Sequence, residues 1–140
     1  MKNAAFLAAL AAAAALASPA LAKPVTLTAT LTGAAQTGGG DADGTGGFKA
    51  DADDDSGDFC FTLWAEKTTK PTMSHVHIGA AGADGKPVAT LEITGKDSDS
   101  CIAMEPSLIK EIVANPAGYY VNVHTADFPN GAIRGQLEKK

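Results

Sequence analysis

The sequence predicts an all-β fold, an antiparallel Greek-key β-sandwich or barrel with one short helix. Two observations lead to this prediction. Short runs of apolar, β-branched and aromatic residues alternate with period two, which is the pattern of strands with one buried face. Turn-forming stretches separate these runs at close spacing, and 15 of the 140 residues are glycine.

The first 22 residues have the pattern of an export signal. Lys2 supplies a positive charge, residues 4–16 form an apolar run, and Ala20-Leu21-Ala22 is a small-x-small cleavage site. The apolar run is too short for a good membrane anchor. We therefore expect a signal peptide over residues 1–22, no membrane anchor, and a periplasmic or secreted protein with one domain over residues 23–140.

Eight strands are expected from the alternation of apolar residues. They cover residues 25–31, 48–50, 59–65, 73–78, 88–93, 101–103, 119–124 and 132–137. In the 59–65 strand, Phe59, Phe61 and Leu63 share the face that we expect to be buried. The last two strands are expected to form a hairpin, because Asn130-Gly131 between them is a turn sequence.

Two segments of the N-terminal half are expected to be irregular. Residues 33–47 contain many glycines and predict a loop. The acidic run 51–58 resembles the start of an EF-hand calcium loop, but Ser56 stands where that loop needs glycine and Thr62 where it needs glutamate. A solvated hairpin turn is therefore the preferred interpretation of this run.

One helix is predicted, over residues 106–114. Pro106 suits the first turn of a helix. Apolar residues recur with helical spacing at Leu108, Ile109, Ile112 and Val113. The helix is expected to end before Pro116, because proline cannot continue it.

The chain contains two cysteines, Cys60 and Cys101. Export to an oxidising compartment makes a disulfide the leading interpretation. A pair of soft metal ligands is the alternative, although neither cysteine lies beside a histidine in the sequence. The formal charge of −5 argues against nucleic acid and anionic membranes as partners.

All three histidines fall in two of the predicted strands. His75 and His77 share one face of the 73–78 strand, and His124 ends the 119–124 strand. If these strands are neighbours, three imidazoles meet at one point and suit copper or zinc. Met73 is in phase with His75 and His77, and its thioether would favour Cu(I), although a methionine on a strand usually fills core space. The alternative is that the histidines form hydrogen bonds that order the following glycine loop.

Three further residues are candidates to support this site. Asn122 shares a face with His124 on the same predicted strand. Arg134 is the only arginine and is expected to form a structural ion pair, for example with Asp127, in preference to attracting an anion. No nucleophile elbow or pair of apolar-embedded carboxylates is found, so no catalytic residue is predicted and catalysis is not favoured.

Two segments resemble the signatures of the CHRD (chordin-type) domain family. Residues 75–82 resemble its His-x-His-x-Gly motif, and residues 115–125 with 128–137 resemble its closing motif. This resemblance implies a secreted β-sandwich domain of the bacterial type, similar to the modules of chordin-like extracellular proteins.

A more distant resemblance is to the copper/zinc superoxide dismutases. His75 and His77 with the later His124 resemble the copper ligands of those enzymes, which are also Greek-key sandwiches. The chain has no fourth histidine to bridge to zinc, so a zinc-bridged dismutase is excluded and a copper-only site remains.

Three functions stay open, in this order. The first is an exported metal-binding protein, with copper favoured, for periplasmic storage, delivery or buffering. The second is a non-metal extracellular binding or structural module that contacts another exported protein. The third is a copper-only redox enzyme of the superoxide dismutase type.

Overall fold

The computed structural model describes residues 23–140, so the predicted signal peptide lies outside the described residues. The described part contains nine strands, one α-helix and the 3-10 turns η1 (Gly33–Ala35) and η2 (Pro116–Gly118). The strands and the helix are β1 (Val25–Thr32), β2 (Thr45–Ala52), β3 (Asp58–Glu66), β4 (Pro71–Ile78), β5 (Pro87–Leu91), β6 (Ser100–Ala103), α1 (Pro106–Ala114), β7 (Tyr119–Thr125), β8 (Ile133–Gln136) and β9 (Glu138–Lys139).

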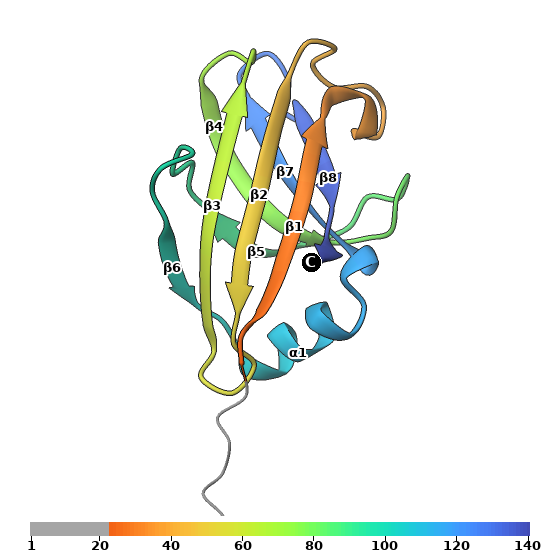
Figure 1. The fold of residues 1–140 in the computed structure, drawn as a ribbon. Coiled ribbons are helices and arrows are strands. Elements are labelled where there is room, and N and C mark those ends of the chain that lie inside the picture. The colour runs from red at the N-terminus through yellow and green to blue at the C-terminus, as the bar shows by residue number, and fades with distance from the viewer. Residues whose placement is uncertain (1–22) are drawn as a thin grey trace, which may run out of the picture.

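All the strands belong to one curled antiparallel sheet, with the order β5-β4-β7-β8-β1-β2-β3-β6 and with β9 paired to β1. The sheet turns back on itself between β8 and β1, where Thr32 opposite Arg134 is the one paired position. In Figure 1, β1, β2 and β3 therefore form a layer in front of β4, β7 and β8. This arrangement confirms the predicted all-β class with one short helix.

The hydrophobic core lies between the two layers. Phe59, Phe61 and Leu63 on β3 are fully buried, as their alternation predicts. α1 has the predicted bounds and closes the lower end of the layers in Figure 1, where it buries Ile109 and Ile112. Because apolar residues alternate along each strand, the side chains between them lie on the outer face of each layer, away from the core.

The structure corrects the prediction that the glycine loop runs to residue 47. β2 begins at Thr45 and therefore includes Gly46 and Gly47. A Cβ on Gly47 would lie 2.1 Å from the Trp64 indole, which belongs to the neighbouring strand β3. Glycine stands here because the indole occupies the space of a side chain, so the glycine is a packing requirement of a strand.

The predicted 88–93 strand was too long at its end. β5 ends at Leu91, and Ile93 is exposed. The backbone N–H of Thr94 donates to the carbonyl of Leu63, and the Thr94 hydroxyl accepts from the Leu63 N–H. These bonds draw the chain after Leu91 towards β3, in the other layer. The last predicted strand, 132–137, corresponds to β8, and the short strand β9 follows it.

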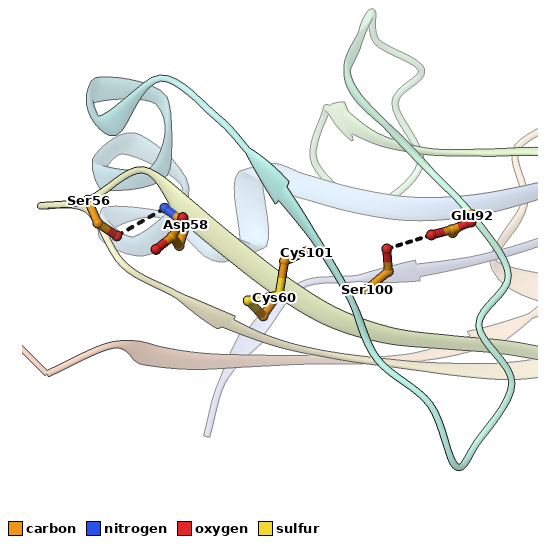
Figure 2. The surroundings of a disulfide bond; sticks show 6 residues. All are labelled: Ser56, Asp58, Cys60, Glu92, Ser100 and Cys101. Atoms are coloured by element: carbon orange, nitrogen blue, oxygen red, sulfur yellow. Dashed lines mark hydrogen bonds between the residues drawn. A yellow bond between two sulfur atoms is a disulfide. The ribbon is translucent and has the colours of Figure 1, made fainter.

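A disulfide joins Cys60 and Cys101, as predicted. The two residues lie directly opposite each other in the pairing of β3 with β6, and Figure 2 shows the bond between these strands. β6 forms one edge of the sheet and has β3 as its sheet neighbour. The disulfide therefore ties an edge strand to the layer that β1, β2 and β3 form.

None of the helices within residues 23–140 has the length and apolar character needed to cross a membrane.

Candidate metal centre

The three histidines lie on adjacent strands in one layer. β4 carries His75 and His77, β7 carries His124, and these strands run antiparallel side by side (Figure 1). Val76, Val121 and Val123 on the same strands point into the core. Because side chains alternate between faces, the histidines lie on the outer face of the layer.

Two loops cover this outer face. Residues 79–86 follow β4, and residues 126–131 follow β7. His77 and His124 are only 9% and 8% exposed, respectively. The site is therefore a covered polar layer on the sheet, outside the hydrophobic core.

The imidazole nitrogens come close enough for one ion to contact all three rings. One ligand atom from each of His75, His77 and His124 lies within 4.8 Å of the others. Nδ1 of His75 is 3.3 Å from Nε2 of His124. Metal–nitrogen bonds of about 2.0–2.1 Å place ligand nitrogens roughly 3.3–3.6 Å apart. The pair from His75 and His124 has that spacing, and the third ring would have to move closer to complete a three-nitrogen site.

Backbone carbonyls select the tautomers of two of the rings. Nδ1 of His77 donates to the Gly85 carbonyl at 2.8 Å, and Nδ1 of His124 donates to the Pro129 carbonyl at 2.9 Å. A carbonyl can only accept, so a neutral ring at either position carries its proton on Nδ1 and keeps a lone pair on Nε2. Within residues 23–140, the buried Nε2 of His77 has no hydrogen-bond partner. Histidine ligands of metals have this arrangement, with the second nitrogen donating to a carbonyl or carboxylate.

The electrostatics of the cluster favour a neutral His75 ring. The pKa of His75 is lowered, first by burial and then by repulsion from His124 and His77. Neutral imidazole is the form that binds a metal ion. Burial and the two neighbouring rings thus reduce competition from protons at His75.

Two more of the predicted site residues adjoin the cluster. Met73 lies directly opposite His124 in the pairing of β4 with β7, and its side chain is exposed. Asn122 lies directly opposite His75 and is buried, and its Oδ1 has no hydrogen-bond partner within the described part of the chain. Both residues therefore lie at strand positions directly opposite a histidine of the cluster.

Arg134 forms its ion pair with a residue that the sequence did not suggest. Its NH1 is 3.4 Å from Asp84 in the loop 79–86, whereas Asp127 is exposed on the loop 126–131. The pairing with Asp127 was therefore wrong. Chain proximity suggested it, but the guanidinium reaches across Tyr120 towards the other loop, with its Cζ 3.4 Å from the Tyr120 ring centroid.

Sequence reasoning gave no role to two residues that hold His77. The Tyr120 ring is stacked on the His77 ring, with 4.8 Å between centroids and an interplanar angle of 10°. The one sequence signal for Tyr120 was that it shares a strand face with Asn122 and His124. Gly85 has no such signal, since only the fold of the loop brings its carbonyl to His77.

The alternative metal sites do not form. Cys60 and Cys101 are in the disulfide and are not thiolate ligands. The acidic run folds as the predicted hairpin turn, in which Asp53 accepts from the N–H groups of Asp55 and Ser56. Within residues 23–140, the histidine cluster is the one group of three or more histidine, cysteine or acidic residues whose ligand atoms are this close together.

The fold and the site together define a disulfide-bonded β-sandwich domain with a three-histidine cluster on one outer face. A family model of the CHRD domain matches residues 27–137, and the chain belongs to the CHRD domain family. The CHRD domain is a β-sandwich module of the extracellular type, and the disulfide fits an exported protein. A search of curated proteins and a search of solved structures found no significant match.

Proposed function

We propose that this protein is an exported metal-binding protein, which binds copper through His75, His77 and His124 for storage, delivery or buffering in the periplasm. The supporting observation is the buried Nε2 of His77, which has no partner within residues 23–140 while Nδ1 of the same ring is held by a carbonyl. An unpaired buried nitrogen is costly, and a bound ion would remove that cost.

Copper is preferred to other ions on the chemistry of the donors. Imidazoles suit copper and zinc, and copper binds a given nitrogen site more tightly than zinc does. Met73 beside His124 offers a thioether, which favours Cu(I) in particular. Asn122, directly opposite His75 and with an unpartnered Oδ1 among residues 23–140, would accept a hydrogen bond from a water molecule or other small ligand on the ion.

Metal titration of the metal-free domain tests this proposal. Cu(I), Cu(II) and Zn(II) are titrated into residues 23–140 against competing chelators, and we expect one copper ion per chain. The variants His75→Ala, His77→Ala and His124→Ala should each lower copper affinity by about 100-fold or more. Thr90→Ala is the matched control, because Thr90 is exposed directly opposite His75 but has no metal-binding nitrogen.

The decisive comparison is between the triple histidine variant and the wild-type domain. Equal copper affinity in these two proteins would exclude the proposed site. The Thr90→Ala protein should bind copper with wild-type affinity, which shows that local changes at the edge of β4 do not matter by themselves.

One observation favours the second candidate, a module that binds another exported protein without metal. A groove of about 380 Å³ lies along β4 and the end of β5, and Met73 and Ile93 expose large apolar side chains there. Exposed apolar grooves often bind protein partners. If this function holds, partner capture from the same compartment is lost in Met73→Ser with Ile93→Ser and is retained in the triple histidine variant.

A further inference from the structure

We infer that Arg134 is a positioning residue of the metal site, which acts on His77 through Tyr120 and the loop 79–86 without touching the ion. The inference rests on the proposed function for the identity of the ion, but the action on His77 is a property of the metal-free protein. Four sets of contacts carry it.

The first set joins Arg134 to the loop. The side chain is 1% exposed, and its NH2 donates to the carbonyls of Ala80 and Ala83 at 2.8 and 2.9 Å. NH1 reaches Asp84 at 3.4 Å. One buried guanidinium therefore contacts three residues of the loop. Arg134 belongs to β8, whereas the loop follows β4, two strands away in the sheet.

The second set positions the guanidinium itself. NH1 donates to the Thr37 hydroxyl at 3.1 Å, and Nε and NH2 donate to Gln136 Oε1 at 3.3 and 3.0 Å. Gln136 in turn donates through Nε2 to the carbonyl of Gly79, at the start of the loop. Arg134 is therefore also held by Gln136 on its own strand and by Thr37, which lies outside the loop 79–86.

The third set is a stack of three planar groups. Arg134 packs over the Tyr120 ring at 3.4 Å, and Tyr120 packs on His77 at 4.8 Å. Arg134 and His77 reach Tyr120 from β8 and β4, the strands on either side of β7. A planar guanidinium stacks on an aromatic face in a way that an ammonium group does not.

The fourth set is the Gly85 peptide, which closes the connection. Its N–H donates to the Tyr120 hydroxyl at 3.3 Å, and its carbonyl accepts from Nδ1 of His77 at 2.8 Å. Gly85 is adjacent to Asp84, the last loop residue that Arg134 holds. The position of this carbonyl decides which nitrogen of His77 carries the proton, and so whether Nε2 is available to a metal ion.

The charge of the buried Arg134 guanidinium contributes little to the stability of the fold. Within residues 23–140, the carboxylate that pairs with Arg134 is that of Asp84, whose side chain is 66% exposed, so solvent screens the ion pair. Desolvation of a guanidinium is costly, and apolar residues of similar size often stabilise a fold as well or better. An apolar side chain could not supply the hydrogen bonds that the guanidinium donates to the loop while it stacks on Tyr120.

The test reads the His77 tautomer directly. In metal-free, ¹⁵N-labelled residues 23–140, two-bond ¹H–¹⁵N correlations distinguish a protonated Nδ1 from a protonated Nε2. The wild-type domain should show His77 protonated on Nδ1 alone. Arg134→Lys keeps the charge but loses the fork and the stack, so both tautomers of His77 should appear and copper affinity should fall about 10- to 100-fold.

Two further variants separate positioning from folding. Tyr120→Phe keeps the stack but removes the hydroxyl that Gly85 contacts, and should also mix the His77 tautomers in a folded domain. Asp127→Asn is the matched control, because Asp127 is an exposed acid on the other covering loop and is not paired with Arg134; it should leave the tautomer unchanged and copper affinity within about fivefold of wild type.

The outcomes distinguish this inference from the proposed function. A single Nδ1-protonated His77 in both Arg134→Lys and Tyr120→Phe would overturn the positioning role, whatever the copper affinity. A wild-type domain that binds no copper, but whose His77 tautomer changes in these variants, would remove the proposed function and leave the positioning role in place.

Discussion

Met73 lies directly opposite His124 in the pairing of β4 with β7, and 54% of its side chain is exposed. An exposed thioether can rotate towards an ion at His124, and thioethers prefer Cu(I) to Zn(II). We predict that Met73→Leu lowers Cu(I) affinity about tenfold and leaves Zn(II) affinity unchanged. Anaerobic titration against a Cu(I) chelator measures the first quantity.

Met104→Leu is the matched control for this substitution, because Met104 packs against the core. It should leave both affinities unchanged. An equal loss of Cu(I) and Zn(II) affinity in Met73→Leu would show that Met73 shapes the site without binding the ion.

The lowered pKa of His75 predicts how the stability of the metal-free protein depends on pH. Folded His75 binds a proton less readily than it does in the unfolded chain, so the unfolded state takes up more protons as the pH falls. The stabilisation that the neutral ring provides is complete above the usual pKa of histidine, about 6.5, and is lost as the pH falls through the lowered pKa.

NMR titration of the His75 ring measures this shift. We expect a midpoint below that of an exposed histidine, and an upward change in that midpoint in His124→Gln, which removes one source of repulsion. Burial remains in that variant, so the pKa should stay below the usual value. A wild-type midpoint at the ordinary value would contradict the prediction.

Loss of the disulfide should affect stability but not metal binding. The Cys60–Cys101 bond closes a separation of 41 residues, which in the chain-entropy model corresponds to about 4 kcal/mol. We predict this loss in the free energy of unfolding for Cys60→Ala with Cys101→Ala, measured by urea denaturation. Copper affinity should be unchanged, since the bond joins β3 and β6, in the layer opposite the histidines. A loss of copper binding in the folded double variant would be evidence that the two layers are coupled.

Gly47→Ala should destabilise the fold by overpacking. The new Cβ would lie 2.1 Å from the Trp64 ring, and relief of such a clash typically costs about 1–3 kcal/mol. Trp64→Phe removes the atoms involved, so the double variant should lose less stability than the two single losses combined. Thermal unfolding of the four proteins in a double-mutant cycle gives the coupling energy, and additive losses would contradict the packing explanation.

Much of the fold could be predicted because its signals are local. Alternation of apolar residues located the strands, and Pro106 with Pro116 marked both ends of α1. The start of β2 could not be predicted in this way. Gly47 looks like a loop residue until Trp64 is known to lie beside it, and that contact exists only after β2 pairs with β3.

The candidate site was predictable to a similar extent. The shared face of His75 and His77 follows from strand geometry, and the meeting with His124 followed once two strands were assumed to be neighbours. The partners of Arg134 did not follow, because they lie about fifty residues earlier in the chain. Only the packing of the loop 79–86 on β7 and β8 brings them to the guanidinium.

The position of the histidines on the outer face of β4 and β7 has a consequence for protein engineering. The valines on the inner face of the same strands belong to the hydrophobic core, whereas the histidines and their covering loops do not. New ligands or altered loop lengths can therefore be introduced above the sheet while the interior sequence is kept. If the cluster binds an ion as proposed, the domain is a scaffold on which selectivity for that ion can be redesigned separately from folding.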